Sequence, residues 1–94
     1  MLDLEEIFEK YNDEFLEFDR VENKLSERMD LHAFILLDKL VPGTSDIVCS
    51  SEHDEFWVDT NPEELASVAT EQNIIDLIRC GMQFEEGLGF SFLT

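Results

Sequence analysis

The chain has 94 residues, 44% of them apolar, a composition that suits one globular domain with a modest core. It carries 23 acidic residues against six basic ones, a formal charge of −17. Nucleic acid and anionic membranes are therefore disfavoured as direct partners, because contacts to phosphates need Lys and Arg side chains. Eight phenylalanines argue against a disordered acidic tail, since such segments are poor in aromatic residues. With neither a secretion signal nor a long apolar run, we expect a cytoplasmic protein.

Apolar residues at helical spacing predict a first amphipathic helix over residues 3–18. Asp3 followed by Glu6 fits the pattern of a capping box at its start. The remaining arc is acidic: residues 1–19 hold eight acids and one base. A helix of this length would space its acids at about 3.5 Å along the axis, close to the spacing of about 3.4 Å between phosphates of one DNA strand.

A second helix is expected over residues 21–40 and ends before Pro42. Asp19 followed by Glu22 repeats the capping signal, and the sequence leaves open whether the two helices are one with a bend near Asp19. Residues 31–37 are apolar nearly all round, which predicts that this part lies at the centre of the core.

The middle of the chain predicts a hairpin followed by a helix. Two apolar runs, residues 47–49 and 56–58, flank a polar tetrad at residues 51–54, as expected of a hairpin with a longer connection. Asn61 then offers a cap and Pro62 a first helical position, so a helix is expected from Pro62 to about Ala69.

The last third predicts another helix and another hairpin. Thr70 is the expected cap of a helix that stops at Cys80 and Gly81. Strands alternating in hydrophobicity follow on either side of a two-residue turn at residues 86–87.

The elements together indicate a single α+β domain with a small antiparallel sheet of two β-hairpins, covered by three or four helices in the order ααββααββ. The expected core residues are the following: Phe8, Tyr11, Phe15, Leu25, Phe34, Leu36, Val48, Phe56, Val58, Leu65, Ile75, Ile78, Phe84 and Phe90.

Three residues invite a choice between a structural and a functional role. Trp57 alternates with Phe56 and Val58, so it faces away from them; cover by helices or by the second hairpin is favoured over an exposed anchor for a partner. Cys49 and Cys80 are expected to be reduced thiols that act as small buried hydrophobes.

No catalytic, metal or cofactor motif is recognisable. His53 and Glu55 form half of a zinc deaminase signature, but the Pro-Cys-x-x-Cys half is absent, and the histidines and cysteines lack zinc spacing. The acids near residues 52–59 lack the spacing and the central glycine of a calcium loop. The sequence therefore predicts a protein that is not an enzyme and holds no metal or cofactor.

The charge leaves a basic protein surface as the natural partner. Residues 40–94 add eleven acids against a single base, so the charge is spread over the whole domain. The candidate partner-binding residues come from the first helix and the first hairpin: Glu5, Glu6, Glu9, Asp13, Glu14, Glu17, Glu52, Asp54, Glu55, Trp57 and Asp59.

Residues 53–58, 63–65 and 74–81 look like stretches of small acidic proteins of unknown role encoded by bacteriophages. In size and charge the whole chain is similar to phage DNA-mimic inhibitors, which occupy the nucleic-acid site of a host restriction or CRISPR enzyme. That resemblance implies a non-enzymatic inhibitor in the cytoplasm of a bacterial host, binding the basic surface of a nucleic-acid-binding enzyme. Two alternatives remain: an acidic phage accessory or assembly protein that uses its charge only for solubility, and a regulator that docks away from any nucleic-acid site.

Overall fold

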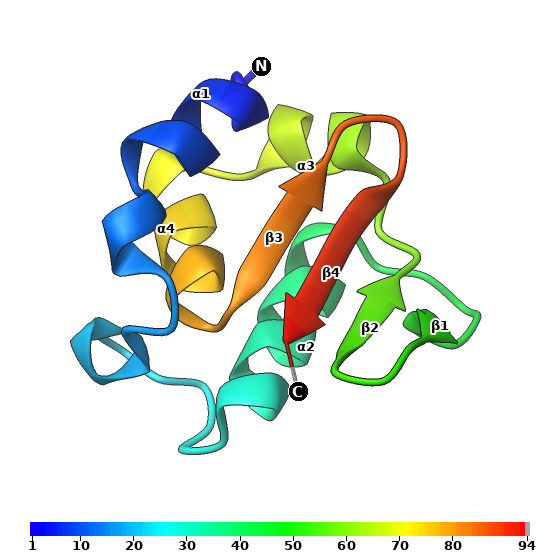
Figure 1. The fold of residues 1–94 in the computed structure, drawn as a ribbon, viewed down its shortest axis with the longest axis horizontal. Helices are drawn as coiled ribbons and strands as arrows, with labels where there is room; N and C mark the ends of the chain where they lie inside the picture. The colour runs from blue at the N-terminus through cyan, green and yellow to red at the C-terminus, as the bar shows by residue number, and fades with distance from the viewer. Residues whose placement is uncertain (94) are drawn as a thin grey trace.

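The computed structural model describes residues 1–93 and contains two groups of helices, each followed by a β-hairpin (Figure 1). The first group comprises α1 (Leu4–Lys10), the 3-10 turns η1 (Asn12–Glu14) and η2 (Phe18–Arg20), and α2 (Met29–Leu40). Then come β1 (Val48–Ser51), β2 (Glu55–Val58), α3 (Pro62–Val68), α4 (Glu71–Arg79), β3 (Met82–Glu85) and β4 (Gly89–Leu93). The predicted α+β class is confirmed, and the order agrees with ααββααββ apart from the two short turns.

The four strands form one antiparallel sheet in the order β1-β2-β4-β3, so the two hairpins join through β2 and β4. In that junction Phe56 lies opposite Phe92, and Trp57 lies opposite Ser91. In Figure 1, β1 forms one edge of the sheet, while α1 and α4 lie beyond β3 at the other edge. Within residues 1–93, none of the helices combines the length and apolar character that a membrane crossing requires.

The helices pack on one face of the sheet through aromatic side chains. The Phe34 ring from α2 lies 5.6 Å from the Phe56 ring, in an edge-on arrangement. The Phe8 ring from α1 lies 5.7 Å from the Phe84 ring of β3. Because side chains alternate along a strand, the residues between these aromatics point to the opposite face of the sheet. Trp57 is one of them.

The helix starts follow the capping signals in the sequence. The Asn61 side chain accepts hydrogen bonds from the backbone N–H groups of Glu63 (2.8 Å) and Glu64 (3.2 Å). Thr70 and Asn73 form a reciprocal capping box at α4. Asp3 accepts a hydrogen bond from the backbone N–H of Glu6 at 3.2 Å, as a cap of α1 does.

The predicted first helix is too long, because α1 ends at Lys10. Leu16 has a φ of 64°, a left-handed conformation that an α-helix does not contain, and its N–H donates to the Ile78 carbonyl. The Leu16 side chain also covers Gly81, where an added Cβ would come within 2.7 Å of it. Contacts with the end of α4 therefore decide the path of residues 11–20, and the 3.5 Å line of charges along one long helix does not form.

The predicted second helix also starts too early, since α2 begins at Met29. Asp19 lies within η2, so its expected role as a cap is wrong. Asn23 has a left-handed φ of 52°, and the N–H of Leu25 donates to Nδ1 of His32 at 3.0 Å. The backbone N–H of Leu25 is therefore satisfied by a side chain rather than by a helical hydrogen bond.

The core is largely as predicted, with four errors. Leu25 and Val48, expected inside, are 39% and 38% exposed. The all-apolar stretch of α2 is not central on every side, because Leu31 and Ile35 lie at its surface, 44% and 36% exposed. The other expected core residues are buried or packed against the core. The core also contains Ala33 and Leu37 from the predicted central stretch and Cys80, whose burial was expected. The residues that it adds to the prediction are Leu4, Ile7, Ala66, Ile74, Leu77, Met82 and Phe92.

The turn between β3 and β4 has three residues rather than the two predicted. Glu85 pairs with Gly89, which leaves Glu86, Gly87 and Leu88 as the connection. Gly87 and Gly89 have φ values of 86° and 105°, backbone conformations that glycine adopts without strain. As a result Leu88 does not join the strand and is 72% exposed.

Candidate protein-binding surface

The acids predicted on the first helix fall into two groups. Glu5, Glu6 and Glu9 are exposed on α1, and Asp13 is exposed in η1. Glu14 instead turns inward towards the end of α4, so it does not belong to this open acidic surface.

Glu14 is held by two arginines. Its Oε2 accepts from Nη1 of Arg20 at 2.9 Å and from Nε of Arg79 at 3.2 Å. Arg79 also donates to Asp76 (3.3 Å) and to the carbonyl of Arg20 (3.2 Å). The hydrogen bonds from Arg79, and then those from Arg20, hold the pKa of Glu14 below its usual value. Glu17 lies 3.8 Å from Arg20, so both Glu14 and Glu17 already have cationic partners.

The hairpin acids lie at both ends of β2. Glu52 and Asp54 are exposed in the turn between β1 and β2, whereas Glu55 at the start of β2 is partly buried. Asp59 follows the other end of β2, is exposed, and accepts a hydrogen bond from Ser45 at 3.3 Å. The β1–β2 turn and Asp59 therefore mark opposite ends of one strand.

The two predicted sets of acids do not adjoin. Glu5 and Glu9 lie on α1, which packs beside β3, whereas the β1–β2 hairpin forms the opposite edge of the sheet (Figure 1). A surface that includes both sets must therefore cross the sheet.

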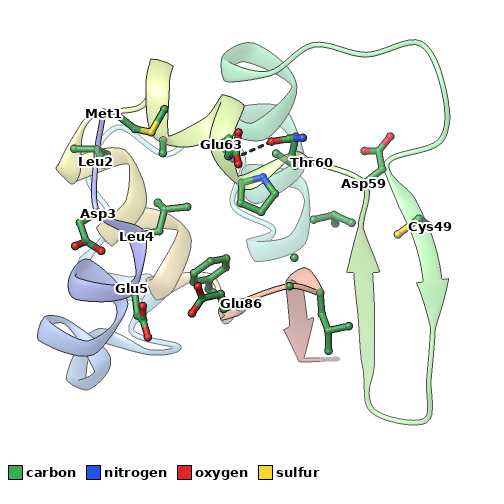
Figure 2. A pocket seen from close by; sticks show the side chains of 18 residues that line it. Met1, Leu2, Asp3, Leu4, Glu5, Cys49, Asp59, Thr60, Glu63 and Glu86 are labelled. Carbon is green, nitrogen blue, oxygen red and sulfur yellow. Dashed lines mark hydrogen bonds between the residues drawn. The ribbon is translucent and has the colours of Figure 1, made fainter.

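A groove lies at the end of the sheet where Asp59 follows β2, and it connects α1 with Asp59; Glu52 and Asp54, at the other end of β2, do not line it. It encloses about 890 Å³ between the start of α1, the start of α3 and the β3–β4 turn. Figure 2 shows Asp3 and Glu5 on its α1 side, Glu86 on the turn, and Asp59 near β1. Glu63 from α3 completes the acidic lining. Five carboxylates from four separate segments therefore share one hollow.

Trp57 is only partly covered. It is partly buried, lies on the face of the sheet away from α1 and α2, and is not among the residues packed against the core. Its neighbours across the strands are Ser50 and Ser91. The predicted cover, by the first helices or by the second hairpin, is only partial: β4 of the second hairpin lies beside Trp57, whereas α1 and α2 pack on the other face.

The two cysteines have different environments and remain free thiols. Cys80 is 2% exposed, and burial raises the pKa of its thiol to about 12, as suits a small buried hydrophobe. Cys49 is exposed, so its predicted burial is wrong. It lies at an irregularity in β1, lines the groove, and its Sγ donates to the Trp57 carbonyl at 3.5 Å.

The histidines also differ. His53 is exposed in the β1–β2 turn. His32 is 3% exposed; Nδ1 accepts from Leu25, and buried Nε2 has no hydrogen-bond partner. Burial lowers the pKa of His32, so the neutral imidazole is favoured. Among residues 1–93, no three His, Cys, Asp or Glu side chains are grouped as metal ligands would be.

Asp3, Glu63 and Glu86 are the groove acids that were not predicted as partner-binding residues. Asp3 and Glu63 look like ordinary helix-start residues, and Glu86 looks like part of a turn. Only the packing of α1 and α3 around the β3–β4 turn brings them together, and no local pattern encodes it. Comparison of the chain with protein-family models, curated protein sequences and solved structures finds no match.

Proposed function

We propose that this protein binds the basic nucleic-acid-binding surface of a host protein and blocks it, without catalysing a reaction. Its carboxylates stand in for phosphates, as in the DNA-mimic inhibitors that it resembles in size and charge. We place this activity in the cytoplasm of a bacterial host.

The observation that carries this proposal is the shortage of internal partners for the acids. Within residues 1–93, the ion pairs use three of the 23 carboxylates, namely Glu14, Glu17 and Asp76. The sole base of residues 40–94, Arg79, is bound to two of these three. A compact domain that holds so many unpaired carboxylates has a strong negative field, which speeds encounter with a basic cleft.

The shape of the domain supports a bent contact. The acids of α1 form no long straight row, because this helix has only seven residues. The exposed acids instead run from α1 across the groove to Asp59, and Glu52 and Asp54 extend the charge along the hairpin edge. A basic cleft that receives the end of the sheet would meet carboxylates from several segments at once. Trp57 supplies a partly exposed aromatic ring on the adjoining face.

The test is affinity capture of host proteins at low and high salt, with charge reversal as the perturbation. Glu5→Lys, Glu9→Lys and Asp13→Lys together should abolish capture of a nucleic-acid-binding partner. The matched control reverses Glu22, Glu27 and Asp38, three acids that are also exposed but lie in the segment before α2 and on α2. It changes the net charge equally and should retain capture.

The complex should also weaken with salt and compete with DNA or RNA. The proposal fails if both triple variants lose the partner equally, because net charge alone would then explain the binding. It also fails if the captured partner still holds its nucleic acid.

A second candidate rests on α2. Leu31 and Ile35, one helical turn apart, are exposed together. An accessory or assembly protein that binds its own kind would use such a patch, with the charge serving solubility. Sedimentation analysis decides this: a concentration-dependent dimer that Leu31→Ser and Ile35→Ser abolish would favour assembly over inhibition.

A further inference from the structure

The groove at the end of the sheet has an apolar floor beneath its acidic rim. Leu4, Val58 and Ala66 form part of the lining and are each at most 7% exposed, so they are fixed in the core. Phe84 adds a partly buried aromatic ring. A volume of about 890 Å³ falls within the range of sites that hold drug-sized ligands, roughly 300–1,000 Å³.

The rim of the groove also has an exposed apolar side chain. Leu88 in the β3–β4 turn is 72% exposed and lines the groove. Gly87 and Gly89 of the same turn also line the groove, and a Cβ built on either would meet no atom within 4 Å, so the space next to this turn is open. An incoming apolar side chain could therefore contact both Leu88 and the floor.

The charged side chains around the groove all have one sign. Asp3, Glu5, Asp59, Glu63 and Glu86 line it, and no Lys, Arg or His side chain does (Figure 2). A nucleic acid or an anionic metabolite would be repelled. A second copy of this chain, itself at −17, would bring further carboxylates to the rim.

We propose that this groove binds a short basic segment of another protein, with an apolar side chain anchored on the floor and flanking Lys or Arg side chains paired with the rim acids. Charge selects the segment, and the anchor supplies affinity that salt does not remove. This surface goes beyond phosphate mimicry, because a phosphate-like surface needs no apolar floor. It shares Glu5 and Asp59 with the surface of the proposed function but does not depend on that function, since the segment need not belong to a nucleic-acid-binding protein.

The probe is a library of random nonapeptides, selected for binding to the intact protein. The enriched peptides should contain Lys or Arg together with Leu, Ile, Met or Phe. For one enriched peptide labelled with fluorescein, replacing its apolar residue by Lys should weaken binding about tenfold, the effect of losing one buried anchor.

Variants of the groove and matched controls locate the site. Leu88→Ser and Glu86→Lys change exposed residues of the β3–β4 turn, and each should weaken the peptide about three- to tenfold. The controls are Val68→Ser, which likewise replaces an exposed aliphatic side chain by serine, and Glu71→Lys, the same charge reversal; both positions are exposed and lie outside the groove. They should bind the peptide like the unmodified chain.

Cys49 supplies a readout at the site, because it lines the groove and is exposed. Bound peptide should slow its alkylation by iodoacetamide in proportion to occupancy. The proposal is overturned if an all-Lys peptide binds as tightly as the anchored one, if the control variants lose as much affinity as the groove variants, or if saturating peptide leaves Cys49 alkylation unchanged. None of these results depends on a nucleic-acid-binding partner, so failure here and failure of the proposed function are separate outcomes.

Discussion

The cap of α3 offers the sharpest test of how this fold is held. Asn61 accepts hydrogen bonds from two N–H groups at the start of a helix only seven residues long. Asn61→Ala leaves both donors to water and removes the side chain that fixes the entry of the chain into α3. The same helix contributes Pro62, Glu63 and Ala66 to the groove.

The expected cost follows from the behaviour of other caps. Replacing an asparagine cap by alanine costs about 0.5–2 kcal/mol, and two lost hydrogen bonds place this case in the upper half, at about 1–2 kcal/mol. A domain of this size has a total stability of roughly 5–14 kcal/mol, so the loss is substantial. It corresponds to a fall in Tm of about 4–8 °C per kcal/mol.

Urea unfolding followed by circular dichroism measures this, with two further substitutions as controls. Asn61→Ser keeps a side-chain acceptor and should stay near the original stability, and Asn61→Gly should cost only a few tenths of a kcal/mol. If the serine variant is as unstable as the alanine variant, hydrogen bonding by the cap is not what stabilises α3. Equal stability of all three variants would lead to the same conclusion.

Three further predictions concern titratable groups. Ellman's reagent should label one thiol in the native protein and a second only after unfolding, because Cys49 is exposed whereas burial raises the pKa of Cys80 to about 12; fast native labelling of both would contradict the fold. Burial lowers the pKa of His32, so its neutral form is favoured and the free energy of unfolding should fall as the pH drops below the ordinary histidine value of about 6.5. His32→Asn keeps an acceptor and should lose this dependence, and identical stability profiles of the two proteins between about pH 5 and 8 would refute it. Hydrogen bonds from Arg79 hold the pKa of Glu14 down, so Glu14→Gln should destabilise the protein at neutral pH. The difference in stability between the two proteins should vanish as the pH falls below the ordinary glutamate pKa of about 4.3. A difference in stability that persists in acid would point to packing instead.

Signals that act within three residues were sufficient to predict much of this fold. Asn61 and Thr70 bond backbone N–H groups two or three positions away, so a sequence window contains the whole interaction. The alternating strands around residues 47–58 and 82–92 likewise carry their period locally. For the same reason the α+β class was predictable before any long-range contact was known.

The errors arise where distant residues decide the backbone. Residues 11–18 have helical periodicity, yet Glu14 binds Arg79 from 65 positions away and Leu16 bonds to Ile78. Residues 21–28 do not form the predicted helix, and the backbone N–H of Leu25 donates to the His32 side chain instead. In the candidate site, composition predicted exposed acids, but it could not show that Glu14 is paired or that Asp3 and Glu86 share a groove.

The open edge of β1 has a consequence for the colloidal behaviour of the protein. All four of its residues, Val48–Ser51, are exposed and uncharged, so the strand lacks the lysines or prolines that often keep sheet edges of separate molecules apart. Mutual repulsion between molecules of charge −17 takes over that task at neutral pH. Near the isoelectric point of about 4.1 the repulsion disappears, and edge-to-edge pairing of β1 should cause precipitation. Three reversals to lysine add six charges and leave −11, so each charge-reversal variant must be shown to be monomeric before a loss of partner binding is attributed to the acids themselves.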